Sequence, residues 1–144
     1  LMVDYAHNPH GVKALGNYIK NIAASKKVGI IAGVGDRRDE DIIAVGEESA
    51  KIFDEIIIRS DDDLRGRTEA EITDLLRKGI QKVHPNKSIF YFKNEIEAIG
   101  YAVESAVPDS FIVLMVEKID RACEKVRELQ AQERFSTNKM QIAV

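Results

Sequence analysis

Short apolar runs recur along the chain at intervals, and each lies between longer stretches of mixed polarity. The runs are rich in β-branched residues and nearly continuous, which is typical of strands buried on both faces of a parallel sheet. The predicted strands end at Val3 and cover Val28–Ala32, Glu55–Arg59, Ser88–Phe92 and Phe111–Val116.

Between these runs, apolar residues recur at three- and four-residue spacing, which predicts helices with one buried face. Asn8 with Pro9, the capping box Thr68–Glu71, and Asn94 are the start signals. The predicted helices extend from Pro9 to about Ser25, from Asp39 to Phe53, from Thr68 to about Val83, from Asn94 through Val103, and from Asp120 to about Gln132. After Arg134 the tail is polar, and Met140–Val144 could add an edge strand.

The alternation of strands and helices predicts an α/β fold: a Rossmann-like three-layer sandwich with a mainly parallel sheet flanked by helices. In such sheets, ligands bind beyond the carboxyl ends of the strands. Four chain segments should therefore face the same side: Asp4–Asn8, Gly33–Asp39, Arg59–Arg67 and Glu117–Lys118.

Composition limits the classes of protein to consider. The 144 residues form one predicted domain, 44% hydrophobic and 31% charged, which is typical of a globular chain. The net charge of −3 and the lack of an apolar run of about 20 residues argue against nucleic-acid binding and a membrane span. No signal-peptide pattern is present, so we expect a cytoplasmic protein. Because the chain starts inside a strand at Leu1, we also expect it to be a piece of a longer protein.

Metal binding has little support in the sequence. The single Cys123 cannot form an internal disulfide, and neither it nor the histidines has the spacing of metal ligands. We therefore predict no metal ligands within this chain.

The first candidate site is the strand-to-helix corner Asp4–Pro9 (DYAHNP). Asp4, His7 and Asn8 crowd at a helix N-terminus, where the helix dipole favours anions such as phosphates. The alternative is that these side chains only satisfy backbone groups of a tight turn.

The second candidate is the glycine-rich corner Gly33–Asp39 (GVGDRRD). It lacks the third glycine of a dinucleotide-binding fingerprint and the Gly-Lys-Ser/Thr ending of a P-loop. Either it is a plain turn with solvated charges, or its glycines let backbone approach a ligand while Arg37 or Arg38 pairs with phosphate or carboxylate.

The third candidate is the corner Arg59–Arg67 (RSDDDLRGR). The adjacent carboxylates of Asp61, Asp62 and Asp63 repel one another unless a cation neutralises them. A metal, a guanidinium or an ammonium group could do so, and a solvated acidic turn is the alternative.

The Asp4–Pro9 run resembles the motif that opens the C-terminal domain of the Mur ligase superfamily. The resemblance implies a domain that closes over ATP while an amino acid is joined to a carboxylate through an acyl phosphate. It implies that Asp4 hydrogen-bonds the ribose and that His7 and Asn8 lie near the phosphates or adenosine. The superfamily also has a similar glycine-then-Asp-Arg-Asp corner, which Asp36 and Arg37 match.

The acidic corner departs from the peptidoglycan ligases of this superfamily. Ser60–Asp61 match their Ser-Asp-Asn-Pro-Arg motif, but Asp62–Leu64 replace Asn-Pro-Arg. The form DDDLRGR instead resembles the cyanophycin synthetase branch, whose members add aspartate and then arginine to a polymer. The implied substrate-binding residues are Asp36, Arg37, Asp61, Asp62, Asp63, Arg65 and Arg67. After the last strand only Lys118 matches the peptidoglycan ligases.

The resemblance implies ATP and Mg²⁺ as cofactors, but the chain contains no Walker-type lysine. The phosphate cradle and most of the magnesium site are therefore expected in an upstream P-loop ATPase domain of the same polypeptide, and the isolated domain is expected to be inactive. The expected partners are an amino acid or an aspartate–arginine polymer, with a homo-oligomer left open. The alternatives are a folylpolyglutamate synthase, a peptidoglycan ligase, or a non-catalytic Rossmann-like binding module.

Overall fold

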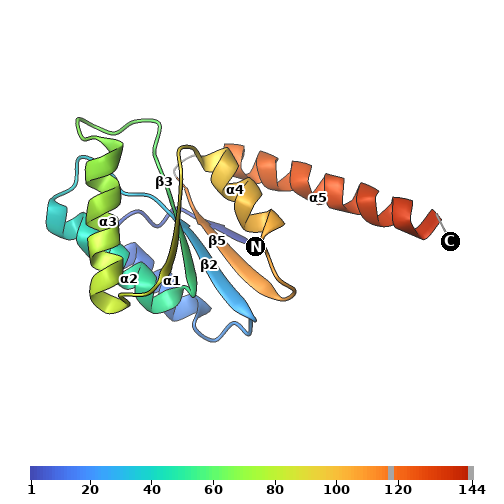
Figure 1. Ribbon diagram of the computed structural model, residues 1–144, viewed down its shortest axis with the longest axis horizontal. Coiled ribbons are helices and arrows are strands. Elements are labelled where there is room, and N and C mark those ends of the chain that lie inside the picture. Colours follow the sequence, from blue (N-terminus) through green and yellow to red (C-terminus); the bar gives the residue numbers. More distant parts are fainter. Residues whose placement is uncertain (117–118, 143–144) are drawn as a thin grey trace.

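The computed structural model describes the backbone of residues 1–116 and 119–142 and the side chains of residues 1–116 and 119–132. Strands and helices alternate along the chain, as the hydrophobic pattern predicts (Figure 1). The strands are β1 (Met2–Asp4), β2 (Lys26–Ile31), β3 (Glu55–Arg59), β4 (Ser88–Phe92) and β5 (Ser110–Met115). The helices are α1 (Pro9–Ile19), α2 (Asp39–Ile52), α3 (Glu69–Val83), α4 (Glu95–Glu104) and α5 (Ile119–Ile142).

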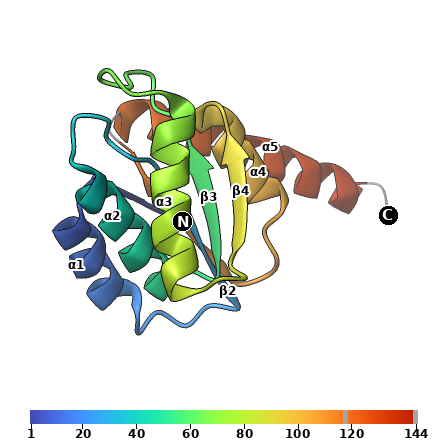
Figure 2. The ribbon, with the colours of Figure 1, turned by 60° about the vertical axis from the view of Figure 1, so that its left-hand side comes forward.

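The described strands form one sheet in the order β1-β5-β2-β3-β4, and every neighbouring pair is parallel. Ile30 of β2 lies opposite Ile57 of β3 and Leu114 of β5, which places like apolar residues side by side. Parallel pairing directs the carboxyl ends of all these strands to one edge, at the top in Figure 2. The predicted α/β sandwich with a parallel sheet is confirmed.

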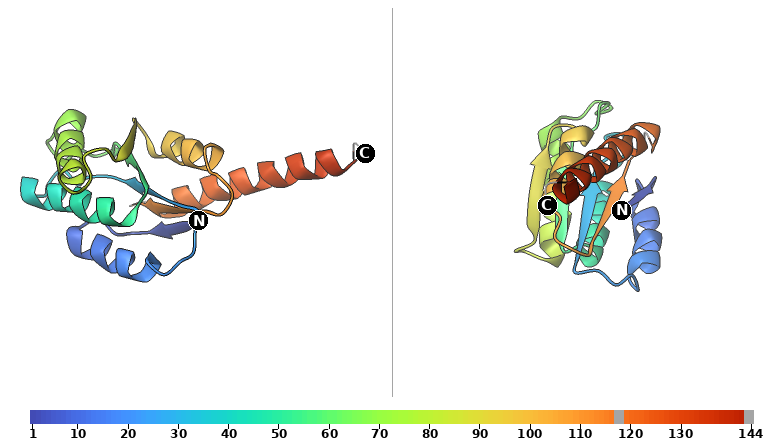
Figure 3. Two further views of the ribbon diagram at one scale, coloured as in Figure 1. Left: turned by 60° about the horizontal axis from the view of Figure 1, so that its bottom comes forward. Right: turned by 90° about the vertical axis from the view of Figure 1, so that its right-hand side faces the viewer.

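Helices cover both faces of the sheet (Figure 3). Helices α1, α2 and α3 enclose one hydrophobic core, to which Leu15, Ile42 and Leu76 contribute. Helices α4 and α5 enclose the second core, centred on Ile99 and Leu114. Strand residues alternate between the two cores, so the strands are apolar at nearly every position.

Helices α2 and α3 touch through their backbones. A Cβ at Gly46 would overlap the Leu76 carbonyl oxygen, and one at Gly79 would overlap the Ile43 carbonyl oxygen. Only glycine permits this approach at both points. The two helices therefore pack without side chains between them at these positions.

Two boundaries differ from the sequence-based prediction. Helix α1 ends at Ile19 rather than near Ser25, because the Ser25 N–H donates to the Asp109 carbonyl 3.0 Å away and the chain must reach β2. The predicted edge strand at Met140–Val144 is wrong for Met140–Ile142, since α5 continues as a helix to Ile142, well beyond Gln132 (Figure 1). The remaining residues of that segment lie outside the described part. Among the described residues, no helix has the length and apolarity needed to cross a membrane.

Candidate functional site

Three of the four predicted corners meet at the carboxyl edge of the sheet. The segments after β2 and β3 lie close enough for Arg67 to bond the backbone of Gly35, and residues after β1 and after β2 line a common cavity. The fourth corner, Glu117–Lys118, lies outside the described residues. The topology thus gathers the candidate residues as the parallel-sheet rule predicts.

At the first corner, Asp4 and His7 both have local partners. One Asp4 carboxylate oxygen accepts the Ala6 N–H at 2.7 Å. The Nδ1 atom of His7 lies 3.0 Å from the Tyr5 carbonyl oxygen. The rings of Tyr5 and His7 meet edge to face, with their centroids 4.9 Å apart. These contacts stabilise the turn, as the alternative interpretation of this corner expects.

Asn8 is the N-cap of α1. Its Oδ1 atom accepts the Gly11 N–H at 2.9 Å, and its carbonyl accepts the Val12 N–H at 3.0 Å. Pro9 has no N–H to offer, so few donors remain at this helix end for an anion. The helix dipole still makes the end electropositive.

A cavity of about 300 Å³ lies between the start of α1 and the segment that joins β2 to α2. Three of the predicted residues, His7, Asn8 and Arg37, line it. The full lining is His7, Asn8, Pro9, His10, Gly33, Val34, Arg37, Asp41, Ile42 and Val45. Asp4 and the acidic corner are not part of this lining, so the cavity divides the predicted site residues into two groups.

The charges around the cavity leave one arginine available. Arg38 bonds both carboxylate oxygens of Asp41, at 3.0 and 3.1 Å. This hydrogen-bonded pair lowers the pKa of Asp41 and raises that of Arg38. Within the described residues, no side-chain hydrogen bond or ion pair engages the guanidinium of Arg37. The charge of Arg37 also helps to lower the pKa of Asp41. A cation that forms no hydrogen bond or ion pair beside a cavity is suited to bind an anionic group.

Arg67 joins two of the corners. Its Nε donates to the Gly35 carbonyl at 2.9 Å, its Nη2 donates to the Arg37 carbonyl at 2.9 Å, and its Nη1 lies 2.7 Å from an Asp39 carboxylate oxygen. All three guanidinium nitrogens are therefore in use. The contacts fix the segment after β2 against the segment after β3.

Arg65 and Gly35 strengthen this junction. Arg65 donates from Nη1 to an Asp36 carboxylate oxygen at 3.0 Å. Gly35 packs against Leu64 so closely that a Cβ would overlap the Leu64 carbonyl oxygen. Both Arg65 (φ 48°) and Gly66 (φ 88°) adopt left-handed backbone, which turns the chain back toward α3.

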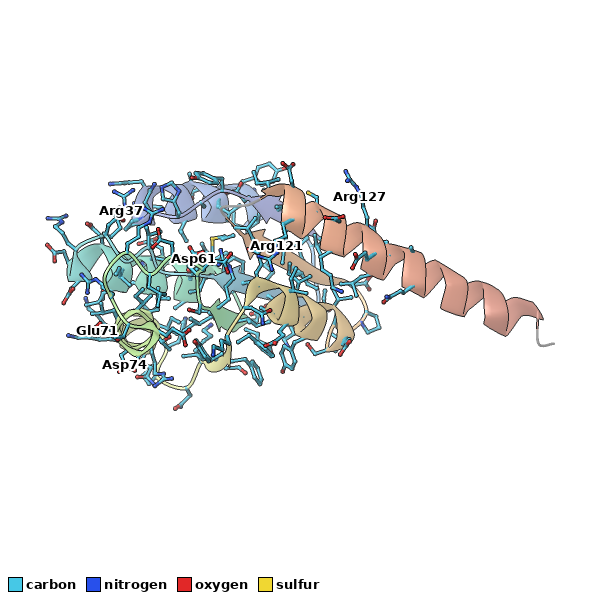
Figure 4. All side chains as sticks on the ribbon, turned by 90° about the horizontal axis from the view of Figure 1, so that it is seen from above. Arg37, Asp61, Glu71, Asp74, Arg121 and Arg127 are labelled. Carbon is cyan, nitrogen blue, oxygen red and sulfur yellow. The ribbon has the colours of Figure 1, made fainter. Side chains whose placement is uncertain are left out.

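The three adjacent carboxylates each meet an arginine of this chain. Asp61 accepts from Arg59 at 3.4 Å, and Asp62 accepts from Arg121 of α5 at 3.4 Å. Asp63 lies 4.0 Å from the Nε of Arg65, whose backbone N–H it also accepts at 2.9 Å. Figure 4 looks onto this edge of the sheet: Asp61 and Arg121 lie nearer α4 and α5, and Arg37 lies on the side of α1. The repulsion noted in the sequence is offset within the fold.

The acidic corner rests on a buried ion pair. Arg59 is 4% exposed, and its Nε lies 3.4 Å from a carboxylate oxygen of Glu95, the first residue of α4. Burial raises the pKa of Glu95, which the positive charge of Arg59 opposes. Asp61, 16% exposed, lies on the other side of Arg59. This network connects the end of β3 to the start of α4.

A bound magnesium ion has no evident ligand set here. Within the described residues, no three side chains of His, Cys, Asp or Glu are placed to hold a metal ion. The carboxylates of Asp61 and Asp62 already meet arginines. The described residues therefore do not fit a resident Mg²⁺.

Sequence reasoning missed several residues of the site. His10 and Asp41 line the cavity, and Glu95 and Arg121 partner the acidic corner. Because His10 lies in the first turn of α1, one residue beyond Pro9, its closeness to His7 and Asn8 in the sequence could have suggested it. The other three become neighbours only through tertiary packing.

Comparison with known families identifies the chain. Residues 1–116 match the family model described as Mur ligase, glutamate ligase domain. The chain belongs to this family. The resemblance noted in the Asp4–Pro9 run is confirmed, and the match covers every described segment that contributes to the cavity.

Similar proteins span a larger length than this chain. A cyanophycin synthetase of Nostoc sp. is 37% identical over 126 residues, which are 88% of this chain and 14% of that protein. The structure of a UDP-N-acetylmuramoyl-L-alanyl-D-glutamate–2,6-diaminopimelate ligase matches with a TM-score of 0.68 at 20% identity, over 78% of this chain and 22% of that one. A Mycobacterium tuberculosis folylpolyglutamate synthase complexed with ADP and AMPPCP matches with a TM-score of 0.58 at 20% identity, over 78% and 26%. The two structural matches establish the shared fold.

Proposed function

We propose that this chain is the C-terminal domain of an ATP-dependent carboxylate–amine ligase similar to cyanophycin synthetase. The proposal rests on membership of the Mur ligase, glutamate ligase domain family and on the 37% identity to a cyanophycin synthetase. Because the chain spans 14% of that relative, catalysis is assigned to the complete polypeptide. This domain supplies one wall of the active site.

The cavity between α1 and the Gly33–Arg38 segment is the proposed nucleotide-facing part of this wall. Arg37 carries the proposal, because it lines the cavity and its guanidinium forms no side-chain hydrogen bond or ion pair in the described part of the chain. When bound, ATP would supply the γ-phosphoryl group that converts the substrate carboxylate to an acyl phosphate. The guanidinium of Arg37 would attract a phosphate, and His7 and Asn8 would lie beside the nucleotide. Such a site would act by positioning the nucleotide and neutralising the charge of its phosphates.

The acidic corner is the proposed substrate side. Asp61 is largely buried, whereas the side chains of Asp62 and Asp63 are 60% and 81% exposed. A cationic amino acid, or the end of an aspartate–arginine polymer, would therefore reach Asp62 and Asp63 first. It would compete there with Arg121 and Arg65. Arginine is the preferred candidate, because its guanidinium can pair with two carboxylate oxygens at once.

The test of the nucleotide role is Arg37→Ala in the complete polypeptide, with ATP binding measured by titration calorimetry. A hydrogen bond to a charged group is worth about 1.5–3 kcal/mol, so the Kd for ATP should rise about tenfold or more. Arg77→Ala is the matched control, because Arg77 lies on the surface of α3 and, within the described residues, pairs only with Asp74. An unchanged Kd in Arg37→Ala, or an equal rise in both variants, would contradict the proposal.

A further inference from the structure

Arg67 uses all three of its guanidinium nitrogens at the carboxyl edge of the sheet, and it is not part of the cavity lining. Its three nitrogens meet two carbonyl oxygens, of Gly35 and Arg37, and the carboxylate of Asp39. Its side chain is 25% exposed. With its donors committed in this way, Arg67 has little capacity left to bind a substrate directly.

The segment that Arg67 holds is the one that forms the cavity. Gly33, Val34 and Arg37 line the cavity, and the carbonyls of Gly35 and Arg37 are the two that Arg67 bonds. Apart from the turn bond of the Arg37 N–H to the Val34 carbonyl at 3.1 Å, this segment has little regular backbone pairing. The orientation of the Arg37 side chain thus depends on a backbone that Arg67 holds.

Arg67 itself is firmly anchored. It precedes Thr68, the N-cap of α3, whose capping box with Glu71 is complete: the Thr68 N–H donates to Glu71 at 2.7 Å and the Glu71 N–H donates to Thr68 at 3.2 Å. Hydrogen bonds from the backbone and hydroxyl of Thr68 lower the pKa of Glu71, which keeps this carboxylate ionised. The guanidinium therefore projects from the rigid start of a helix.

We propose that Arg67 is a positioning residue that sets the orientation of Arg37 toward the cavity, rather than a residue that binds substrate. The planar fork of its guanidinium suits this task, because it can bond acceptors in three directions at once. A lysine carries the same charge on a single nitrogen and cannot reproduce this arrangement. The inference rests on the proposed nucleotide role of the cavity, but its first test does not.

The first test measures amide hydrogen exchange in the 144-residue chain. Arg67→Ala and Arg67→Lys should both accelerate exchange of the Arg37 amide, which is bonded to the Val34 carbonyl, about tenfold or more, because local opening of this segment becomes easier. Arg77→Ala should leave exchange of this amide unchanged. Unaltered exchange in Arg67→Ala, or wild-type exchange in Arg67→Lys, would overturn the inference whatever the ligand results are.

The second test is a double-mutant cycle on the Kd for ATP in the complete polypeptide. Arg67→Ala should raise the Kd about tenfold in the wild-type background and by less than about twofold when Arg37→Ala is already present, since Arg67 acts through Arg37. Equal effects in both backgrounds would overturn the inference. If Arg37→Ala alone leaves the Kd unchanged while exchange accelerates in Arg67→Ala, the proposed function fails and the positioning role stands.

Discussion

The segments that form the cavity beside α1 and the acidic corner after β3 are both rich in charged residues. The two regions differ in how many of these charges are paired within the fold. At the cavity, Asp41 is paired with Arg38, and the neighbouring Arg37 keeps a guanidinium without a side-chain partner in the described part of the chain. At the acidic corner, Asp61 and Asp62 meet Arg59 and Arg121. The density of charge in a sequence therefore does not measure how much of that charge is available to a ligand.

The difference arises from where the partners originate. Asp41 forms its ion pair with Arg38, three positions away, so Arg37 acts on Asp41 through its charge alone. Asp62 is neutralised by Arg121, which lies fifty-nine positions later in α5. A partner that distant is not visible in a local pattern. The acidic corner resembled an empty cation site in the sequence because the partner of Asp62 lies far along the chain, and because the sequence does not show that Arg59 and Arg65 turn toward Asp61 and Asp63.

The largest effect is expected from a substitution that forces apart the cavity segment and the acidic corner. Gly35→Ala should do so, because its Cβ would overlap the Leu64 carbonyl oxygen, a backbone atom that cannot easily move. We expect a loss of about 3 kcal/mol in the free energy of unfolding, at the upper end of typical overpacking costs. Chemical denaturation of the 144-residue chain would measure it.

Gly100→Ala is the matched control for this substitution. A Cβ at Gly100, within α4, would meet no atom within 4 Å. It should leave stability unchanged or raise it by up to about 1 kcal/mol, because alanine favours helices. Equal losses in the two variants would show that the contact between Gly35 and Leu64 is not critical.

The next prediction distinguishes carboxylates within the acidic corner. Asp61→Asn should cost about 2 kcal/mol of stability, because the buried Arg59 loses one of its two charged partners. Asp62→Asn should cost less than about 1 kcal/mol, because its pair with Arg121 is exposed. Thermal and chemical denaturation of both variants would compare them, and a larger loss in Asp62→Asn would reverse the assignment of the structural and accessible carboxylates.

The smallest expected effect is a pH dependence from Glu95. Burial raises its pKa in the folded state above the ordinary value of 4.5, so the unfolded chain ionises first as pH rises. The stability that Glu95 contributes is therefore full below pH 4.5 and is lost as pH rises through the raised pKa. Relative to the wild type, Glu95→Gln should gain stability over this interval and then level off.

The measurement is the free energy of unfolding of wild type and Glu95→Gln from pH 4 upward. Glu97→Gln is the control, since Glu97 is exposed on the same helix. If Glu95→Gln instead lost stability relative to the wild type as pH rises, the attraction of Arg59 for the ionised carboxylate would outweigh the cost of its burial. An equally large trend in Glu97→Gln would mean that Glu95 is not the cause.

Much of the fold could be predicted from the sequence because its signals are local. The β-branched run at Glu55–Arg59 and the capping box at Thr68–Glu71 mark elements whose bounds the structure reproduces. The end of α1 could not be placed, because the bond between Ser25 and Asp109 that redirects the chain joins distant segments. Local patterns fix the type of an element more firmly than its last residue.

The candidate site was predicted less completely than the fold. The rule that ligands bind beyond the carboxyl ends of parallel strands selected the corners. The resemblance to the Mur ligase superfamily selected His7, Asn8 and Arg37 within them, and all three line the cavity. The sequence could not indicate that Arg67 bonds the backbone of Gly35, or that Glu95 lies beside Arg59. Both contacts depend on how neighbouring strands and helices align, and the roles of these residues toward ligands stay predictions.

The glycine contacts between α2 and α3 have a mechanical consequence. Because Gly46 and Gly79 bring the two backbones into direct contact, neither helix can slide or tilt without moving the other. Helix α2 follows the Gly33–Arg38 segment, and α3 follows the acidic corner. A hinge rotation that carries this pair as one rigid body would therefore move the Gly33–Arg38 segment and the acidic corner together, and the spacing between them would be preserved throughout such a motion.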